Sequence, residues 1–206
     1  QFHEFGDLRK NYLMEEVEIP TVADDEVLIR LAYASINPAD RLLVEGSYPG
    51  AGDLPLTVGR DGSGVVEAAG SGSRFKAGDA VMILRSTIGI TRQGTLAEYV
   101  CAPESVVTHV PEGWGGDEAA AAALVYLTAW KALVVQGRVK EGETVLVTGA
   151  TGGVGSAAVQ LAKALGAKVV AMTRDASKSE ALLKLGADVV IESNTRDLAA
   201  DMKAYA

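Results

Sequence analysis

The chain has 206 residues, of which 48% are hydrophobic and 22% are charged, and this balance excludes a disordered or collagen-like chain. Its 19 basic and 27 acidic residues give a net charge of −8, and because a negative surface repels phosphate backbones we expect no nucleic-acid partner. The one cysteine, Cys101, cannot form an internal disulfide, which favours a reducing compartment and a cytoplasmic location. We interpret Cys101 as a small buried residue rather than a nucleophile.

The first half of the chain shows the period-two pattern of β-strands. Apolar residues alternate with their neighbours along residues 27–33, and strand-like runs follow at residues 65–69 and 80–84. Glycine-rich turns separate these runs. Many short strands joined by glycine turns predict a compact β barrel.

The most apolar stretch, residues 119–136, has nearly the length of a membrane span. It contains Lys131, is rich in alanine and lies within a pattern otherwise typical of a soluble protein. We therefore predict a buried helix here and expect no membrane partner.

From residue 118 onward, helical and β-rich runs alternate. The expected strands are residues 143–149, 168–173 and 188–191, and the expected helices are residues 154–165 and 176–185. This alternation predicts a parallel sheet with right-handed crossovers. The pattern changes near residue 116, so we predict an α/β chain with a β-barrel domain at residues 1–116 and a Rossmann domain, a doubly wound parallel sheet, at residues 117–206.

Three strands and two helices make only half of a dinucleotide-binding domain. Residues 194–206 begin a further helical pattern, and the sequence stops there. We therefore expect the chain to be a fragment of a longer protein that lacks the C-terminal part, with residues 117–206 as the first half of the Rossmann domain.

A glycine-rich turn, Gly149–Gly155, joins the first predicted strand of this domain to its first helix. In the pattern G-x-G-x-x-G, Gly152 takes the second position, where no side chain blocks a pyrophosphate, and Gly155 takes the third, where helix and strand pack closely. The N-terminus of the helix offers free N–H groups to the phosphates. The flanking strand and helix favour a cofactor site over a glycine-rich turn without a ligand. The expected contacts come from Ala150, Thr151, Gly152, Gly153, Val154 and Gly155.

The end of the second predicted strand selects between the two nicotinamide cofactors. An NAD site has an acidic residue there, which accepts from the ribose 2′-hydroxyl. This chain has Thr173 and Arg174, with Lys178 one turn later, and a cation suits a 2′-phosphate. Asp175 leaves an alternative open, because it can pair with Arg174 or turn toward a ribose, and Lys178 can equally lie on a solvated helix face. We predict NADP(H), bound by Thr173, Arg174 and Lys178.

A series of motifs along the whole chain carries a family resemblance. They are INPAD (36–40), EGSYP (45–49), GRDGSGVVEAAGSG (59–72), FKAGDAV (75–81), GTLAEYV (94–100), LTAW (127–130) and VLVTGATGGVG (145–155). The chain resembles the medium-chain dehydrogenase/reductase superfamily and, within it, the zinc-free quinone oxidoreductase (zeta-crystallin-like) group. The resemblance implies a GroES-like β barrel followed by a Rossmann domain, and a homodimer in the full-length protein.

The resemblance also implies that no zinc is bound. Zinc members of the superfamily usually hold the catalytic metal with two cysteines and a histidine, and the matching positions here are Asn37, Arg60 and Leu124, none of which replaces a thiolate or an imidazole. The only histidines, His3 and His109, match neither zinc site. Without this Lewis acid, hydride transfer is easiest to an acceptor that already takes electrons, so we expect a small electrophilic substrate.

Two polar side chains are the expected catalytic groups. In similar reductases the tyrosine of the G-x-Y segment, here Tyr48, lies beside the nicotinamide, and a phenol can donate a hydrogen bond to a developing enolate. Asn37 stands at a metal-ligand position and is expected to face the reacting centre. Thr128, in LTAW, matches a position near the cofactor.

Each of these residues also has a plainer interpretation. Tyr48 can be a packing or turn residue, Asn37 can stabilise the Asn-Pro turn, and Thr128 can bond its own helix backbone. We interpret Asp40 as bracing its loop. We interpret Arg60 as a partner of the neighbouring Asp61 rather than of a substrate carbonyl.

The predicted function is NADPH-dependent, zinc-independent hydride transfer to a quinone or an α,β-unsaturated carbonyl. An enoyl thioester reductase is the first alternative, and a non-enzymatic NADPH-binding protein is the second. The run GTLAEY is more similar to the GGYAEY of quinone reductases than to the GTWR of the enoyl branch, which favours the first function.

Overall fold

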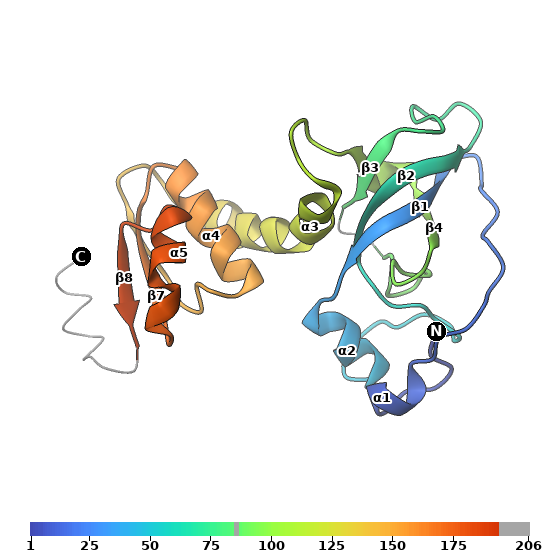
Figure 1. The fold of residues 1–206 in the computed structure, drawn as a ribbon, viewed down its shortest axis with the longest axis horizontal. Helices are drawn as coiled ribbons and strands as arrows, with labels where there is room; N and C mark the ends of the chain where they lie inside the picture. Colours follow the sequence, from blue (N-terminus) through green and yellow to red (C-terminus); the bar gives the residue numbers. More distant parts are fainter. Residues whose placement is uncertain (85–86, 194–206) are drawn as a thin grey trace. The chain divides into compact units, whose positions relative to one another are not determined.

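The computed structural model describes residues 1–84 and 87–193, and it divides into two compact units, Gln1–Leu124 and Val125–Ala206 (Figure 1). Helix α3, Gly116–Trp130, begins in the first unit and ends in the second. The first unit is built on an antiparallel sheet and the second on a parallel sheet. This arrangement confirms the predicted α/β fold class.

The sheet of the first unit has five strands in the order β4-β1-β2-β3-β5. Their bounds are β1 Glu26–Ser35, β2 Asp61–Ala69, β3 Ala80–Ile83, β4 Tyr99–Pro103 and β5 Val107–His109, and a 3₁₀ turn, η1 Glu104–Val106, joins the last two. Two register irregularities between β1 and β2, at Leu28/Ile29 and Leu31/Tyr33, bend the long strands. The sheet therefore curls as a GroES-like half-barrel over a core that includes Val27, Ile29, Val66, Val81 and Val100.

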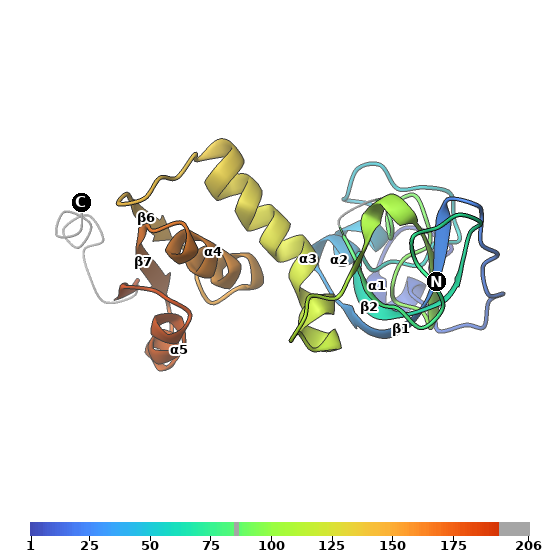
Figure 2. The ribbon, with the colours of Figure 1, turned by 90° about the horizontal axis from the view of Figure 1, so that it is seen from above.

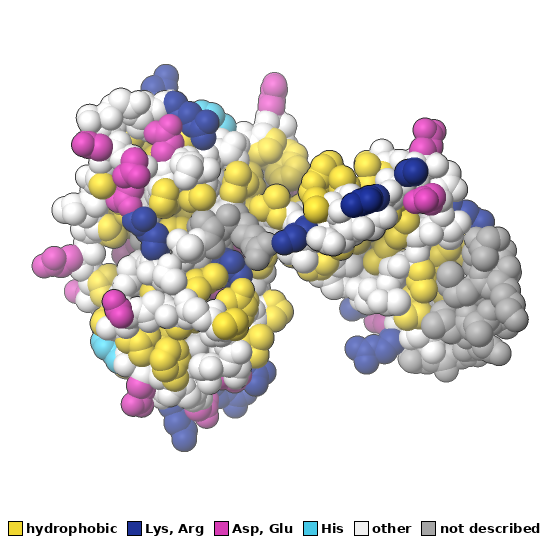
Figure 3. Space-filling view, turned by 180° about the vertical axis from the view of Figure 1, so that it is seen from behind, with side chains coloured by type: hydrophobic (Ala, Val, Ile, Leu, Met, Phe, Trp, Pro, Cys, Tyr) yellow, Lys and Arg dark blue, Asp and Glu magenta, His cyan; other side chains and the backbone are white. Residues whose placement is uncertain are grey.

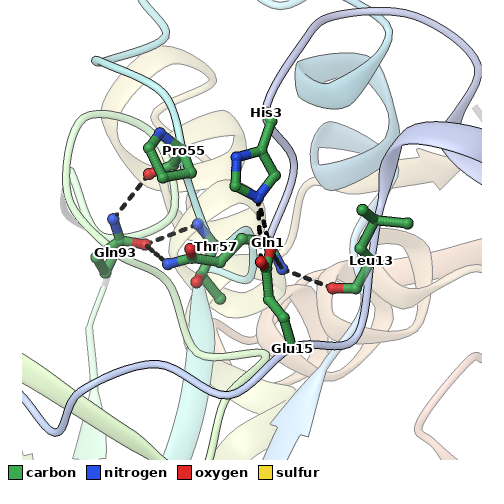
Figure 4. A network of polar contacts seen from close by, with 7 residues as sticks. All are labelled: Gln1, His3, Leu13, Glu15, Pro55, Thr57 and Gln93. Carbon is green, nitrogen blue, oxygen red and sulfur yellow. Dashed lines mark hydrogen bonds and ion pairs between the residues drawn. The ribbon is translucent and has the colours of Figure 1, made fainter.

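A second buried cluster lies beside this sheet, where helix α1, Leu8–Asn11, and helix α2, Pro38–Val44, meet the loop before β2. Its fully buried members are Phe2, Leu43, Val44, Leu56 and Val58. Polar contacts hold the surrounding loops (Figure 4): the Gln93 side chain accepts from the Thr57 backbone N–H at 2.8 Å and donates to the Pro55 carbonyl at 3.0 Å. Tyr48 packs against the cluster, which fixes the loop after α2.

The second unit contains three parallel strands in the order β6-β7-β8, with helices between them. The elements are β6 Thr144–Val147, α4 Gly153–Ala164, β7 Lys168–Thr173, η3 Ala176–Lys178, α5 Ser179–Lys184 and β8 Val189–Glu192. Helix α4 packs on β6 and β7 (Figure 2). The predicted strand–helix alternation is confirmed. The helix predicted at residues 176–185 begins as a 3₁₀ turn, and the Asp175 carboxylate caps this turn by accepting from the Ser177 N–H.

The apolar helix predicted to be buried is only partly so. Helix α3 continues as a π-helix, η2 Lys131–Gln136, and one of its faces packs Leu133 into the core of the second unit. Leu127, Trp130 and Val135 stay 40–52% exposed in the described structure, and Figure 3 shows hydrophobic side chains along this helix. By length and composition alone, Gly116–Gln136 could cross a membrane, a test that an apolar helix packed on protein also passes.

Candidate functional site

The glycine-rich turn between β6 and α4 has the geometry of an anion-binding loop. Gly149 adopts φ +60°, which favours glycine, and turns the chain so that its carbonyl accepts from the Gly152 N–H at 3.0 Å. Gly152 is the N-cap of α4 and offers no side chain to its first turn. The free N–H groups of this turn therefore remain available to a phosphate.

The two later glycines of the loop meet different surroundings. A Cβ on Gly155 would lie 2.3 Å from the Gly149 carbonyl oxygen, so helix and strand approach too closely for any side chain. A Cβ on Gly152 would meet only that same oxygen, at 3.4 Å. Gly155 therefore allows helix and strand to pack closely, while the ligand-facing role of Gly152 stays a prediction.

The remaining loop residues divide into buried and exposed ones. Ala150 is fully buried in the core of the second unit, and its N–H donates to the Met172 carbonyl at 3.2 Å, which ties the loop to β7. Thr151, Gly153 and Val154 are exposed. Any contact of Ala150 with a cofactor would therefore come from its backbone. Thr128 lies exposed on the part of α3 that belongs to the second unit.

The end of β7 is followed by two exposed cations and by a carboxylate that is hydrogen-bonded within its own turn. Thr173 is buried, and its hydroxyl accepts from the Asp175 N–H at 3.1 Å. The Asp175 carboxylate accepts from both the N–H and the hydroxyl of Ser177, and these hydrogen bonds lower the pKa of Asp175. Arg174 and Lys178 are exposed. Of the sequence alternatives for Asp175, the structure shows a third, in which it caps its own turn.

In the first unit, Asn37 lies at the end of the loop between β1 and α2, and its side chain is 8% exposed. Its amide Nδ2 donates to Asp61 Oδ2 at 2.8 Å, and the Ser35 hydroxyl donates to the same oxygen at 3.2 Å. The backbone N–H of Leu124, on α3, donates to Asp61 Oδ1 at 3.1 Å. Asp61 thus joins β1, β2 and α3 at one point.

Burial dominates the electrostatics at this junction. Asp61 is 1% exposed, and burial raises the pKa of its carboxyl although the three hydrogen bonds oppose the rise. Asp40 is 3% exposed and accepts from the N–H groups of Asn37 at 2.7 Å and Gly59 at 3.3 Å, which agrees with its interpretation as a brace of the loop. Burial likewise raises the pKa of Asp40.

Arg60 is buried between these carboxyl groups and Tyr48. Its guanidinium Nη1 donates to the Tyr48 hydroxyl at 3.1 Å, and its central carbon lies 5.8 Å from the centre of the Tyr48 ring. Its charge also favours the ionised forms of Asp40 and Asp61. The interpretation of Arg60 as a partner of Asp61 therefore describes one part of its surroundings, and Tyr48 is a hydrogen-bond partner that the sequence did not reveal.

Two family models match the chain, each over one of these regions. Residues 23–112 match the alcohol dehydrogenase GroES-like domain, and residues 153–206 match the zinc-binding dehydrogenase family. The chain is also 36% identical to the human quinone oxidoreductase over 98% of its own length. The chain belongs to the medium-chain dehydrogenase/reductase superfamily.

Solved structures of this superfamily share the fold. The quinone oxidoreductase of Pseudomonas syringae pv. tomato DC3000 superposes with a TM-score of 0.84 at 34% identity, over all of this chain and 61% of that one. An NAD-dependent alcohol dehydrogenase superposes with a TM-score of 0.90 at 32% identity, over 99% of this chain and 66% of that one. The chain spans 60% of the length of the human quinone oxidoreductase.

The residues of this superfamily member do not fit the catalytic zinc that one family description implies. Three residues stand at the positions of the zinc ligands. Asn37 donates its amide N–H to Asp61, Arg60 is a cation, and Leu124 donates its backbone N–H to Asp61. All three are hydrogen-bond donors, whereas zinc needs thiolate, imidazole or carboxylate ligands. Within the described residues, His, Cys, Asp and Glu form no group of three or more that could hold a metal.

The motifs indicated Asn37 and Tyr48 as catalytic candidates but not the hydrogen bonds that hold them. Asp61 was considered only as a partner of its neighbour in sequence, and Ser35 was not considered at all. A buried aspartate that begins a strand next to an arginine was the available signal, because an ionisable group in a core requires several donors.

Proposed function

We propose that the protein carrying this chain is an NADPH-dependent, zinc-independent oxidoreductase that transfers hydride to a quinone or an α,β-unsaturated carbonyl. The observation that carries the proposal is the buried cluster of the first unit. There Asn37, bound to Asp61, and Arg60, bound to the Tyr48 phenol, stand at the positions of metal ligands, in a chain that also has a dinucleotide-type loop. The similarity to quinone oxidoreductases supports the same chemistry.

The NADPH preference rests on the end of β7. NADP(H), when bound, supplies the hydride, and Gly152, Gly153 and the first turn of α4 would hold its pyrophosphate. Arg174 and Lys178 would meet the 2′-phosphate, while the Asp175 carboxylate accepts two hydrogen bonds from Ser177. A structural relative is named as NAD-dependent, so this preference is proposed from the residues of this chain alone.

We expect Arg174→Ala to weaken NADPH binding by about tenfold or more, the value of one hydrogen bond to a charged group, and to leave NADH binding unchanged. The measurement is fluorescence titration of both cofactors. Lys184→Ala removes a cation from α5 that is paired with Glu180 and exposed, so it serves as the control. Equal binding of NADH and NADPH by the wild-type protein would contradict the cofactor proposal.

Acceptors with conjugated carbonyl groups suit this site because they need no metal. Hydride adds to the far carbon of an enone or to a quinone, and negative charge develops on an oxygen, where a hydrogen-bond donor stabilises it. Tyr48 is the proposed donor, and Asn37, fixed by Asp61, would orient the acceptor. Thr128 would contact the cofactor from α3.

We expect Tyr48→Phe to reduce kcat by about 10²-fold, the usual cost of removing one donor to a developing oxyanion, with NADPH affinity unchanged. The assay follows NADPH oxidation with a quinone, a small enone and an enoyl thioester. Turnover of the enoyl thioester alone would favour an enoyl thioester reductase. NADPH binding without turnover of any acceptor would contradict both enzyme functions and would favour a non-enzymatic NADPH-binding protein.

The single cysteine of the chain bears on its reactivity and its compartment. The Cys101 thiol donates to Glu26 at 3.1 Å, and burial raises the pKa of this thiol, so we propose that Cys101 is unreactive. We also propose a reducing, cytoplasmic location, because one cysteine cannot form an internal disulfide. The partner is a small electrophilic molecule rather than a nucleic acid or a membrane. A homodimer of the full-length protein is proposed from the family resemblance.

A further inference from the structure

Arg60 is a cation in the core of the first unit. It is 6% exposed and follows Gly59, whose N–H is bound by Asp40, and precedes Asp61, whose carboxylate takes three hydrogen bonds. Both neighbours in sequence are therefore fixed, and the charge of Arg60 opposes the rise in the pKa of Asp40 and Asp61. The guanidinium is held in place before any ligand arrives.

The Tyr48 loop is fixed from the other side. The N–H groups of Ser47 and Tyr48 both donate to the Leu42 carbonyl at the end of α2, at 2.8 Å and 3.0 Å. The ring packs on the cluster of Phe2, Leu43 and Val44. The loop contacts therefore hold the half-buried phenol in place, with its oxygen 3.1 Å from Nη1 of Arg60.

The direction of this hydrogen bond determines what the phenol can do. A guanidinium has only donors, so Tyr48 must be the acceptor. The phenol has one proton of its own, which the hydrogen bond from Arg60 does not use. That proton is left for a ligand, and the ligand atom that takes it must be an acceptor such as a carbonyl oxygen.

We propose that Arg60 is a positioning residue for Tyr48. Arg60 orients the phenol so that the phenol O–H donates a hydrogen bond to the carbonyl oxygen of the acceptor. The proposal rests on the proposed function. It adds a specificity rule: acceptors must present an oxygen that receives a hydrogen bond. Arg60 does not itself touch the substrate.

Kinetics of paired variants test whether Arg60 acts through Tyr48. In the protein that carries this chain, Arg60→Met should lower kcat/KM for 2-cyclohexen-1-one about tenfold, the value of a hydrogen bond to a charged group. In the Tyr48→Phe background the same change should cost less than about twofold, because the group it orients is gone. Arg60→Lys should restore part of the loss. Arg41→Met, on α2 and 69% exposed in its side chain, should leave kcat/KM unchanged. An equal loss in both backgrounds would overturn the proposal.

A second measurement does not depend on turnover. With tyrosine labelled by ¹³C at the ring carbon bearing the hydroxyl, the Tyr48 signal is identified by its loss in Tyr48→Phe. We expect Arg60→Lys to shift this signal while Arg41→Met does not, and 2-cyclohexen-1-one to shift it further in the wild-type protein. If no acceptor is turned over, the proposed function fails, while a shift on Arg60→Lys still supports the pair. If neither Arg60→Lys nor the enone changes the chemical shift of the Tyr48 signal, the positioning role is refuted, even in a protein that reduces quinones.

Discussion

Gly152→Ala should strongly weaken cofactor binding while the protein stays folded, and Gly155→Ala should destabilise the second unit. Gly152 has φ −82° and ψ 167°, a conformation that alanine adopts freely, and its added Cβ would meet only the Gly149 oxygen at 3.4 Å. Its methyl group would stand where the pyrophosphate approaches the N-terminus of α4. We expect NADPH affinity to fall by about 10²-fold or more, as when an anion loses several backbone donors.

The Cβ of Gly155→Ala would instead lie 2.3 Å from the Gly149 oxygen and 2.7 Å from the Ala150 Cα. Both atoms are backbone, so neither can move aside without shifting β6 away from α4. Overpacking of this kind costs about 1–3 kcal/mol and more where backbone must shift, which is a large share of the stability of a small unit.

Thermal unfolding and NADPH titration of the two variants separate these roles. The expected pattern is an unchanged melting temperature with lost binding for Gly152→Ala, and a fall of several degrees for Gly155→Ala, since about 1 kcal/mol shifts the midpoint by about 4–8 °C in a unit of this size. The proposed cofactor loop is wrong if Gly152→Ala binds NADPH as the wild-type protein does.

Asp61→Asn should destabilise the first unit by about 1–3 kcal/mol. The carboxylate accepts from Asn37, Ser35 and the Leu124 N–H, whereas asparagine has one acceptor oxygen and turns an amide N–H toward one of these donors. A buried donor without a partner carries the cost of its lost hydration. Glu67→Gln is the matched control on the same strand, because Glu67 is half exposed and its pair with Arg30 contributes little.

The cost of Asp61→Asn should also depend on pH. Burial raises the pKa of Asp61 in the folded protein above its unfolded value of about 3.9, so the folded state binds more protons between these two pKa values. The wild-type protein therefore loses the contribution of this group as the pH rises through the folded pKa, and the variant does not. The difference in unfolding free energy between the two should be larger at about pH 4 than at about pH 8. Chemical denaturation at both values measures it, and a gap that widens with pH would contradict a raised pKa.

Local sequence rules predicted the architecture well because the chain obeys them. The strand at residues 168–173 has the predicted bounds, and the helix predicted at residues 154–165 is α4, Gly153–Ala164. Their apolar residues pack on one shared core, so periodicity alone locates them. The helix at residues 119–136 was predicted less well, because composition alone does not say how much of an apolar helix is covered.

The candidate site was predicted as single residues and not as a cluster. Asn37 and Tyr48 were proposed from their motifs, whereas Arg60 was interpreted only as a partner of Asp61. Their hydrogen-bond partners were not predictable, because the hydrogen bond from Arg60 to Tyr48 spans 12 residues and that from Asn37 to Asp61 spans 24. Such bonds depend on how loops return to a sheet, which no local pattern specifies.

By itself, the sequence determined the two-part α/β organisation, the glycine loop between a strand and a helix, and the cations after β7, since each depends on residues adjacent in the chain. Only the tertiary structure determined the surroundings of Asp61 and Arg60. A buried charged group needs hydrogen-bond partners, and the fold supplies them from distant parts of the chain. Asp61 accepts from Ser35 on β1 and from Leu124 on α3, and the Arg60 guanidinium donates to the Tyr48 phenol.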